Sequence, residues 1–309
     1  MNWVGRQLRK SFRFWFGPIE EIRLRAFEVA FTLTFLCYFY AARFHYWREW
    51  LTPEGYHYSR GATPSFLIDP FPLLQPWSAL ALGAVTGIAG IFVILGRFRK
   101  PALATLAAVS IYIQNADALS AFALNAHYIV GFVVLLLAPG RLVPPKDRIA
   151  REHVLIGSAW PVRTLQLTFL LQIFTAGWCK VEMGDWLNHS DVLWSHVQGP
   201  YRNHLASWLL RTVPMWGWTV MQWGAFLFEL VGPFLIAIRR TRWVGLLWAV
   251  GFTAFIAATM NDLQYFAMQL ASYLTLFLPI TLLELARGQL ARLTPRRRFR
   301  KHSSDFPQT

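Results

Sequence analysis

Residues 165–186 read LQLTFLLQIFTAGWCKVEMGDW, an apolar run of membrane length that places a lysine, Lys180, near its end. A helix needs about 20 apolar residues to cross a hydrocarbon core of roughly 30 Å. A chargeable side chain near the end of such a helix must reach the interface, find a partner or take part in chemistry. Any function assigned to this sequence therefore has to account for Lys180.

The composition of the whole chain is that of a polytopic membrane protein. Of its 309 residues, 55% are hydrophobic and 15% are charged, which lies outside the usual range of soluble domains. The apolar runs show no strand alternation, and each is long enough to cross a bilayer as a helix. We expect an all-α bundle of about eight transmembrane helices, over residues 26–42, 77–96, 101–118, 121–139, 163–181, 216–238, 243–260 and 263–285.

The basic residues predict how these helices are oriented. With both termini inside, 24 of the 30 Lys and Arg residues fall on the cytoplasmic side, as the positive-inside rule requires. Membrane topology thus explains the net charge of +14, and we expect no nucleic acid partner. The long segments 43–76 and 182–215 face outward. We expect an integral protein of the bacterial inner membrane that contacts membrane lipid.

The two ends of the sequence are both basic. Residues 3 to 16 carry arginines and a lysine between apolar residues that recur at helical spacing: Val4, Leu8, Phe12 and Trp15. Such a helix lies on an anionic leaflet. The chain is therefore divided into an amphipathic interfacial segment (1–25), a transmembrane bundle (26–285) and a basic cytoplasmic tail (286–309).

Polar residues inside the apolar runs gather in the half predicted to face outward. At about 1.5 Å of rise per residue, Lys180 lies roughly 26 Å beyond Arg163, and His127 lies roughly 21 Å from Arg141. Polar groups at one depth suggest a cavity for a small amphiphile. The alternative is structural, because a lysine this close to the interface commonly extends to it. The outer polar residues include Gln114, Asn125, His127, Lys180 and Gln222.

Two acidic residues within apolar runs need basic partners. We expect Glu28, near the inner boundary, to pair with an arginine, and Glu229 to bind a basic residue within the bundle. Cys37 and Cys179 lie in apolar runs without a CxxC motif, and the histidines of the outward loops lack tight ligand spacing. We therefore predict neither a disulfide framework nor a metal site.

The segment IFTAGWCKVEMGDWLNHSDVLW around Lys180 resembles the lysine motif of the vitamin K-dependent gamma-carboxylase transmembrane domain, also called the HTTM (horizontally transferred transmembrane) family. Other parts of that domain have counterparts here in the same order, over roughly residues 22 to 285. These counterparts are RFHYWREWLTPEGYHYS, NAHYIVGFVVLLLAPG and FELVGPFLIAIRRTRWVGLLWAVGF.

The resemblance implies a quinol-using enzyme. In the carboxylases, the lysine that matches Lys180 is the base that deprotonates reduced vitamin K, and the histidine that matches His127 supports this chemistry. We expect Lys180 and His127 to be catalytic, and Asn125, Gln222 and Trp178 to bind reduced vitamin K or another quinol. A lysine in a dry site can act as a base near neutral pH.

Two hypotheses of different classes follow. The first is a quinol-dependent oxygenase or carboxylase-like lyase with a lysine base. The second is a non-catalytic membrane scaffold, or a quinone- or lipid-binding subunit of a larger assembly. The carboxylases carry a large lumenal domain that helps to recognise protein substrates, and we expect this chain to lack it. A separate substrate-recognition or assembly protein is therefore an expected partner.

Overall fold

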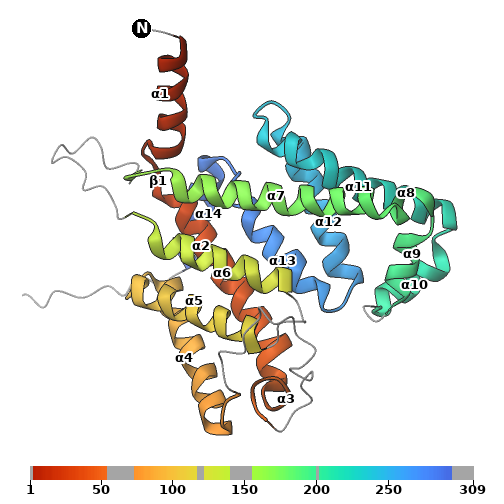
Figure 1. Ribbon diagram of the computed structural model, residues 1–309, viewed down its shortest axis with the longest axis horizontal. Coiled ribbons are helices and arrows are strands. Elements are labelled where there is room, and N and C mark those ends of the chain that lie inside the picture. The colour runs from red at the N-terminus through yellow and green to blue at the C-terminus, as the bar shows by residue number, and fades with distance from the viewer. Residues whose placement is uncertain (1–2, 54–72, 117–121, 140–154, 200–201, 294–309) are drawn as a thin grey trace, which may run out of the picture.

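A computed structural model describes residues 3–53, 73–116, 122–139, 155–199 and 202–293 (Figure 1). Three parts of the predicted topology lie largely outside these residues. They are the predicted outward loop 43–76, the predicted cytoplasmic connection that precedes residue 155, and the predicted cytoplasmic tail beyond residue 293. The described residues form helices and one short antiparallel pair of strands, β1 (Ile19–Glu20) and β2 (Leu155–Ile156). The predicted all-α class is confirmed.

The bundle is built from long helices. They are α2 (Glu21–Tyr38), α4 (Pro76–Leu95), α5 (Arg99–Ala116), α6 (Phe122–Leu137), α7 (Trp160–Met183), α11 (Met215–Ala237), α12 (Arg242–Thr259), α13 (Leu263–Leu274) and α14 (Ile280–Leu293). Shorter elements connect or flank them. These are α1 (Trp3–Phe16), the π turn η1 (Phe39–Arg43), the 3₁₀ turn η2 (Phe44–Tyr46), α3 (Trp47–Leu51), α8 (Asp185–Asn188), α9 (Val192–Gln198) and α10 (His204–Thr212).

Four helical segments in the described part of the chain are long and apolar enough to cross a membrane. They are Glu21–Glu49, Pro76–Leu95, Met215–Ala237 and Arg242–Thr259. A shorter apolar helix covers Leu124–Leu137. Helices of this length and composition are those of a membrane protein. The number of eight crossings and their sidedness stay predictions.

The last predicted crossing, 263–285, is wrong as a single helix. Helix α13 ends at Leu274 and α14 begins at Ile280. Pro279 explains the break, because its ring disfavours helical geometry at the preceding residue and it has no N–H to donate. The carbonyls of Leu276 and Leu278 then need other donors, and the Arg23 guanidinium supplies them at 2.8 and 2.6 Å.

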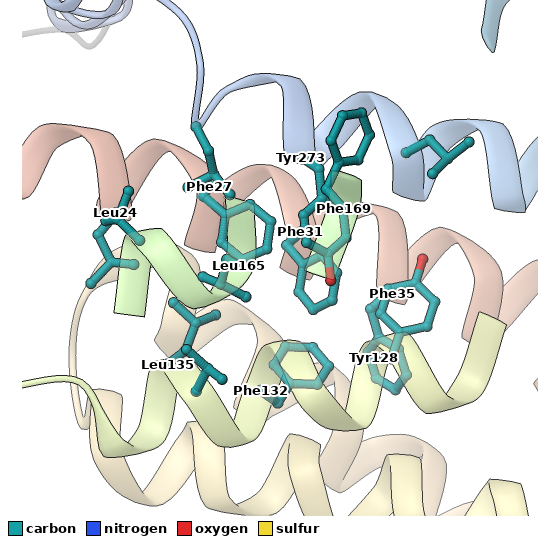
Figure 2. Close-up of a cluster of buried hydrophobic side chains, with 14 of the residues drawn as sticks. Leu24, Phe27, Phe31, Phe35, Tyr128, Phe132, Leu135, Leu165, Phe169 and Tyr273 are labelled. Carbon is teal, nitrogen blue, oxygen red and sulfur yellow. The ribbon is translucent and has the colours of Figure 1, made fainter. Parts of the chain in front are cut away.

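Helix α2 is at the centre of the bundle, and one face of it is a ladder of aromatic rings (Figure 2). Phe27, Phe31 and Phe35 recur every four residues and are fully buried. The Phe31 ring lies 5.0 Å from that of Tyr128 and 5.2 Å from that of Phe132, both on α6. Van der Waals packing of this kind holds membrane helices together, because lipid offers no hydrophobic driving force between them.

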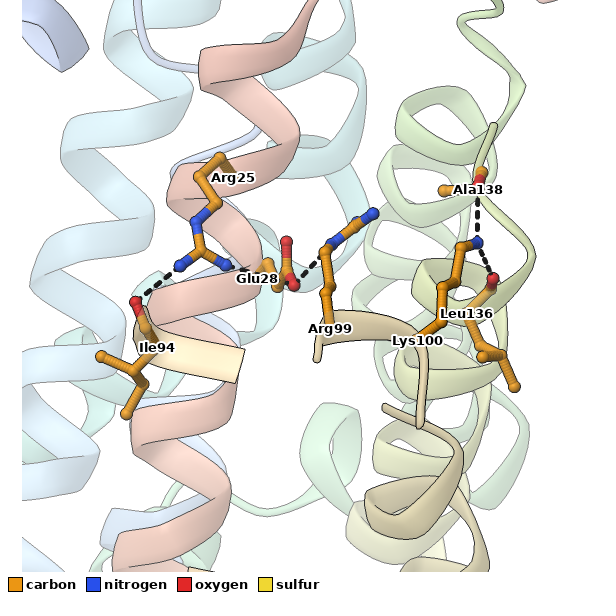
Figure 3. A network of polar contacts seen from close by, with 7 residues as sticks. All are labelled: Arg25, Glu28, Ile94, Arg99, Lys100, Leu136 and Ala138. Atoms are coloured by element: carbon orange, nitrogen blue, oxygen red, sulfur yellow. Dashed lines mark hydrogen bonds and ion pairs between the residues drawn. The ribbon is translucent and has the colours of Figure 1, made fainter. Parts of the chain in front are cut away.

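Charged groups tie the helix ends together at one end of the bundle (Figure 3). The buried Glu28 carboxylate of α2 accepts from Arg99 Nε of α5 at 2.7 Å and lies 3.2 Å from Arg25. Arg25 also donates to the Ile94 carbonyl at the end of α4, and Lys100 donates to the Ala138 carbonyl after α6. The predicted pairing of Glu28 with an arginine is confirmed. Cations at helix C-termini complement the helix dipoles.

Candidate functional site

Lys180 lies in the last turn of α7 and forms an ion pair with Glu229 of α11. Its side chain is 21% exposed and that of Glu229 is 7% exposed, so the pair is largely buried. The predicted basic partner of Glu229 is confirmed and is Lys180 itself, a pairing that the sequence interpretation missed. The reason is geometric. Glu229 lies about 21 Å along α11 from Met215, the first residue of that helix. Lys180, in contrast, is close to the last residue of α7. Depths counted from the two helix ends therefore place the two side chains at different levels.

Gly177 allows α7 to approach α11 at the level of this pair. A Cβ atom at position 177 would lie 2.9 Å from Glu229 Cβ and 3.0 Å from the Glu229 carbonyl carbon. Cβ atoms in proteins rarely approach other atoms so closely, so a larger residue at position 177 would push the helices apart. Small residues are the usual device for close contact between membrane helices. The glycine three residues before Lys180 thus helps to define the geometry of the ion pair.

An aromatic ring covers the Lys180 ammonium. The chain turns back at Gly184, which has a positive φ of 77°, and enters α8, which carries Trp186. The Lys180 Nζ atom lies over the Trp186 ring, 4.0 Å from its centroid. A cation over an indole face is attracted by the ring quadrupole, most strongly where water is excluded. Lys180 is therefore held between a carboxylate and an aromatic face.

Gln222 holds the segment that carries Trp186. Its buried side chain donates to the carbonyls of Trp186 and His189 at 3.1 and 2.6 Å. Its Oε1 atom accepts from the Leu193 N–H at 3.1 Å. All three bonds go to backbone groups, so Gln222 fixes the position of Trp186 over Lys180. A direct contact of Gln222 with a cofactor stays a prediction.

Trp178 lies on a different face of α7 from Lys180, because residues two apart in a helix point in opposite directions. Its side chain is 49% exposed, and its indole N–H donates to Glu182 at 2.8 Å. A half-exposed indole near the end of a membrane helix suits the interface between lipid and water. That Trp178 contacts a quinol stays a prediction.

Asn125 belongs to a second polar group. It is 2% exposed, and its Oδ1 atom accepts from the Tyr38 hydroxyl at 2.8 Å. The Tyr38 hydroxyl in turn accepts from Arg43 Nε at 2.7 Å, in the π turn η1. Single π turns occur frequently at functional sites. These contacts join α2, η1 and α6, whereas those of Lys180 join α7, α8 and α11.

His127 follows Asn125 on α6 and is half-buried. Two residues along a helix correspond to a rotation of about 200°, so His127 and Asn125 point to different faces of α6. That His127 shares a cavity with Lys180 stays a prediction. Within the described part of the chain, no three His, Cys, Asp or Glu side chains converge as metal ligands do.

Comparison with known proteins gives the family. No curated protein and no solved structure matches the chain. The model of the HTTM domain matches residues 16–283, which covers most of the sequence and includes both polar groups described above. The order of motifs around Lys180 and the apolar helices agree with that match. The chain is a membrane protein that belongs to the HTTM domain family.

Proposed function

We propose that this protein is a membrane-embedded enzyme that uses the Lys180 and Glu229 pair as an acid–base site for reduced vitamin K or another quinol. The observation that carries the proposal is the largely buried ion pair of Lys180 with Glu229, covered by Trp186. Intramembrane ionisable residues are costly, and such residues mark functional sites by default. The proposal places the protein in the bacterial inner membrane.

The pair can store and release one proton. In one state the proton is on Lys180 Nζ and the Glu229 carboxylate is ionised. In the other the proton is on Glu229, and Lys180 Nζ has a free lone pair with which to accept a proton. The hydrogen bond from Lys180 Nζ to Glu229 Oε2 allows the proton to pass directly from one group to the other. The Trp186 ring excludes water on one side of Nζ, which keeps the exchange within the pair.

The buried groups near Asn125 suit a ligand that both donates and accepts hydrogen bonds. Among the described residues, Asn125 Nδ2 has no acceptor and Gln269 Oε1 has no donor. Gln269 lies beside this group, since its Nε2 atom donates to the Leu124 carbonyl at 3.0 Å. Buried polar atoms are seldom left unsatisfied. A quinol carries two phenolic hydroxyls and supplies reducing chemistry when bound. In the proposal, one hydroxyl accepts from Asn125 Nδ2 and donates to Gln269 Oε1, which requires this group and Lys180 to line one cavity.

A scaffold is the alternative function. Because Glu229 also packs against Gly177, the ion pair could serve only to hold α7 against α11 in a quinone- or lipid-binding subunit. A partner protein would then supply any catalysis. The two functions differ in what they require of the side chain at position 180.

Substitution of Lys180 tests the proposal. The Lys180→Arg variant keeps the charge and a partner for Glu229, but a guanidinium does not release its proton. We expect it to lose quinol oxidation by about 100-fold or more, the usual contribution of a general base. Quinol consumption in the presence of oxygen and carbon dioxide would be measured in purified protein, with thermal unfolding as the folding control. Full activity of the variant, or no turnover by the wild type, would favour the scaffold.

A double variant separates chemistry from packing. Replacing one member of a buried ion pair leaves an unpaired charge and costs about 3–5 kcal/mol, whereas replacing both with apolar residues is often neutral. We expect Lys180→Met to be unstable alone, and Lys180→Met with Glu229→Met to unfold near the wild-type temperature. The double variant should nevertheless have no quinol turnover.

A further inference from the structure

Helix α1 has an exposed apolar stripe. Leu8 and Phe12, four residues apart, are each 65% exposed, and Phe16 continues the same side. The rings of Phe12 and Phe16 lie 4.9 Å apart, so the stripe is continuous. Apolar residues at this spacing form one face of a helix. A contiguous exposed apolar face of this kind marks a contact surface for a membrane or a partner.

The other side of α1 is strongly basic. Four exposed cationic residues share it: Arg6, Arg9, Lys10 and Arg13. At about 100° per residue, Arg6 and Lys10 lie opposite Leu8 and Phe12. Arg13 lies next to Arg6 on the helical wheel, and Arg9 lies at the border with the apolar stripe, beside Phe16. No acidic residue occurs before Glu20 in the sequence, so the charge of α1 is not balanced within the helix. A helix with one apolar face and one uncompensated basic face suits an anionic lipid surface.

The bundle contacts α1 near the C-terminal end of the helix. Beyond α1 the chain passes Gly17 and forms β1, which pairs with β2 ahead of α7. The Arg163 guanidinium in the first turn of α7 lies over the Phe14 ring, 4.1 Å from its centroid. α1 leaves the end of the bundle where α7 begins and runs crosswise to α7 (Figure 1). The contact with Arg163 thus places α1 at the end of the bundle where α7 begins.

We propose that α1 is a surface anchor that binds the anionic phospholipids of one leaflet, with Leu8, Phe12 and Phe16 in the acyl region and the basic residues at the headgroups. The leaflet is the one at the bundle end that carries Arg25 and Arg99 (Figure 3). Arg163, in the first turn of α7, contacts Phe14 of α1. Lys and Arg near an anionic surface are attracted to it over about a Debye length. Lipid is favoured over a protein partner because the helix carries both an apolar stripe and unbalanced positive charge.

Spin labels on opposite sides of α1 test this anchor. In full-length protein with Cys37 and Cys179 replaced by serine, one variant carries a label at Leu8→Cys and another at Arg6→Cys. Nanodiscs contain phosphatidylcholine with or without phosphatidylglycerol. In nanodiscs with phosphatidylglycerol, we expect the label at position 8 to be more accessible to oxygen than to a water-soluble nickel complex. We expect the label at position 6 to be more accessible to the nickel complex than to oxygen. Without phosphatidylglycerol, the label at position 8 should shift toward water.

Charge removal gives a matched control. The variant Arg6→Gln, Arg9→Gln, Lys10→Gln, Arg13→Gln, labelled at position 8, should shift toward water in the anionic nanodiscs. The control variant loses the same number of charges from the C-terminal tail and should leave the label at position 8 in the acyl region. Its substitutions are Arg296→Gln, Arg297→Gln, Arg298→Gln and Arg300→Gln. Exposure of position 8 to nickel in the anionic nanodiscs would overturn the anchor. An unchanged position after removal of the α1 charges would overturn its dependence on anionic lipid.

Discussion

Gly177 determines how closely α7 and α11 approach beside the candidate site. Because a Cβ atom there would meet Glu229 at 2.9 Å, we expect Gly177→Val to destabilise the protein by about 1–3 kcal/mol, the usual cost of overpacking. The variant should also lose quinol turnover, since it moves Glu229 relative to Lys180. Thermal unfolding in detergent and the turnover assay would measure the two effects.

The control for this prediction is a second glycine on the partner helix. Gly224 on α11 has no atom within 4 Å of a Cβ built at its position. Gly224→Ala should therefore be neutral, or slightly stabilising because alanine has the higher helix propensity. Equal stability losses in the two variants would show that close approach at Gly177 is not the cause.

The short helices after α7 depend on Gln222 for their position. Gln222 makes three hydrogen bonds to the backbone of residues 186–193, each worth about 1 kcal/mol. We expect Gln222→Leu to speed amide hydrogen exchange in α8 and α9 and to leave α5 unchanged. Gln198→Leu, at an exposed position, is the matched control. Unchanged exchange in α8 would mean that packing alone holds this segment.

Single helices were the most predictable part of this protein. The predicted spans 77–96, 216–238 and 243–260 match α4, α11 and α12 to within a residue, because a long apolar run with polar ends has few other solutions in a membrane. The break between α13 and α14 was missed because Pro279 lies within an apolar run, and hydropathy alone does not register the missing N–H.

Contacts between helices were harder to predict than the helices themselves. Glu28 and its arginines lie near helix ends, where boundary counting is accurate, and their pairing was predicted. The pairing of Lys180 with Glu229 depends on how far α7 is shifted along its axis relative to α11. The hydropathy pattern of a single sequence gives no signal for this shift. The π turn at Arg43, which brings Arg43 to Tyr38, likewise left no periodic signal.

At the scale of the whole molecule, the two ends of the bundle differ in chemistry. One end carries arginines that donate to helix C-termini, such as Arg23 and Arg25. The other carries a small apolar cluster built around Leu193, Val197 and Trp218, which packs α9 and α10 against the bundle. The candidate site lies at this second end, next to the short helices and away from the arginines.

The orientation of this asymmetric bundle in the membrane is the last prediction. Lys and Arg are retained on the cytoplasmic side, so the end that carries Arg25 and Arg99 should be inside and the Lys180 end outside. Three exposed arginines report on the two sides. In a protein with Cys37 and Cys179 replaced by serine, Arg202→Cys should react with an impermeant thiol reagent in intact cells. Arg97→Cys and Arg240→Cys should react only after permeabilisation, and the opposite pattern would place the candidate site on the cytoplasmic side.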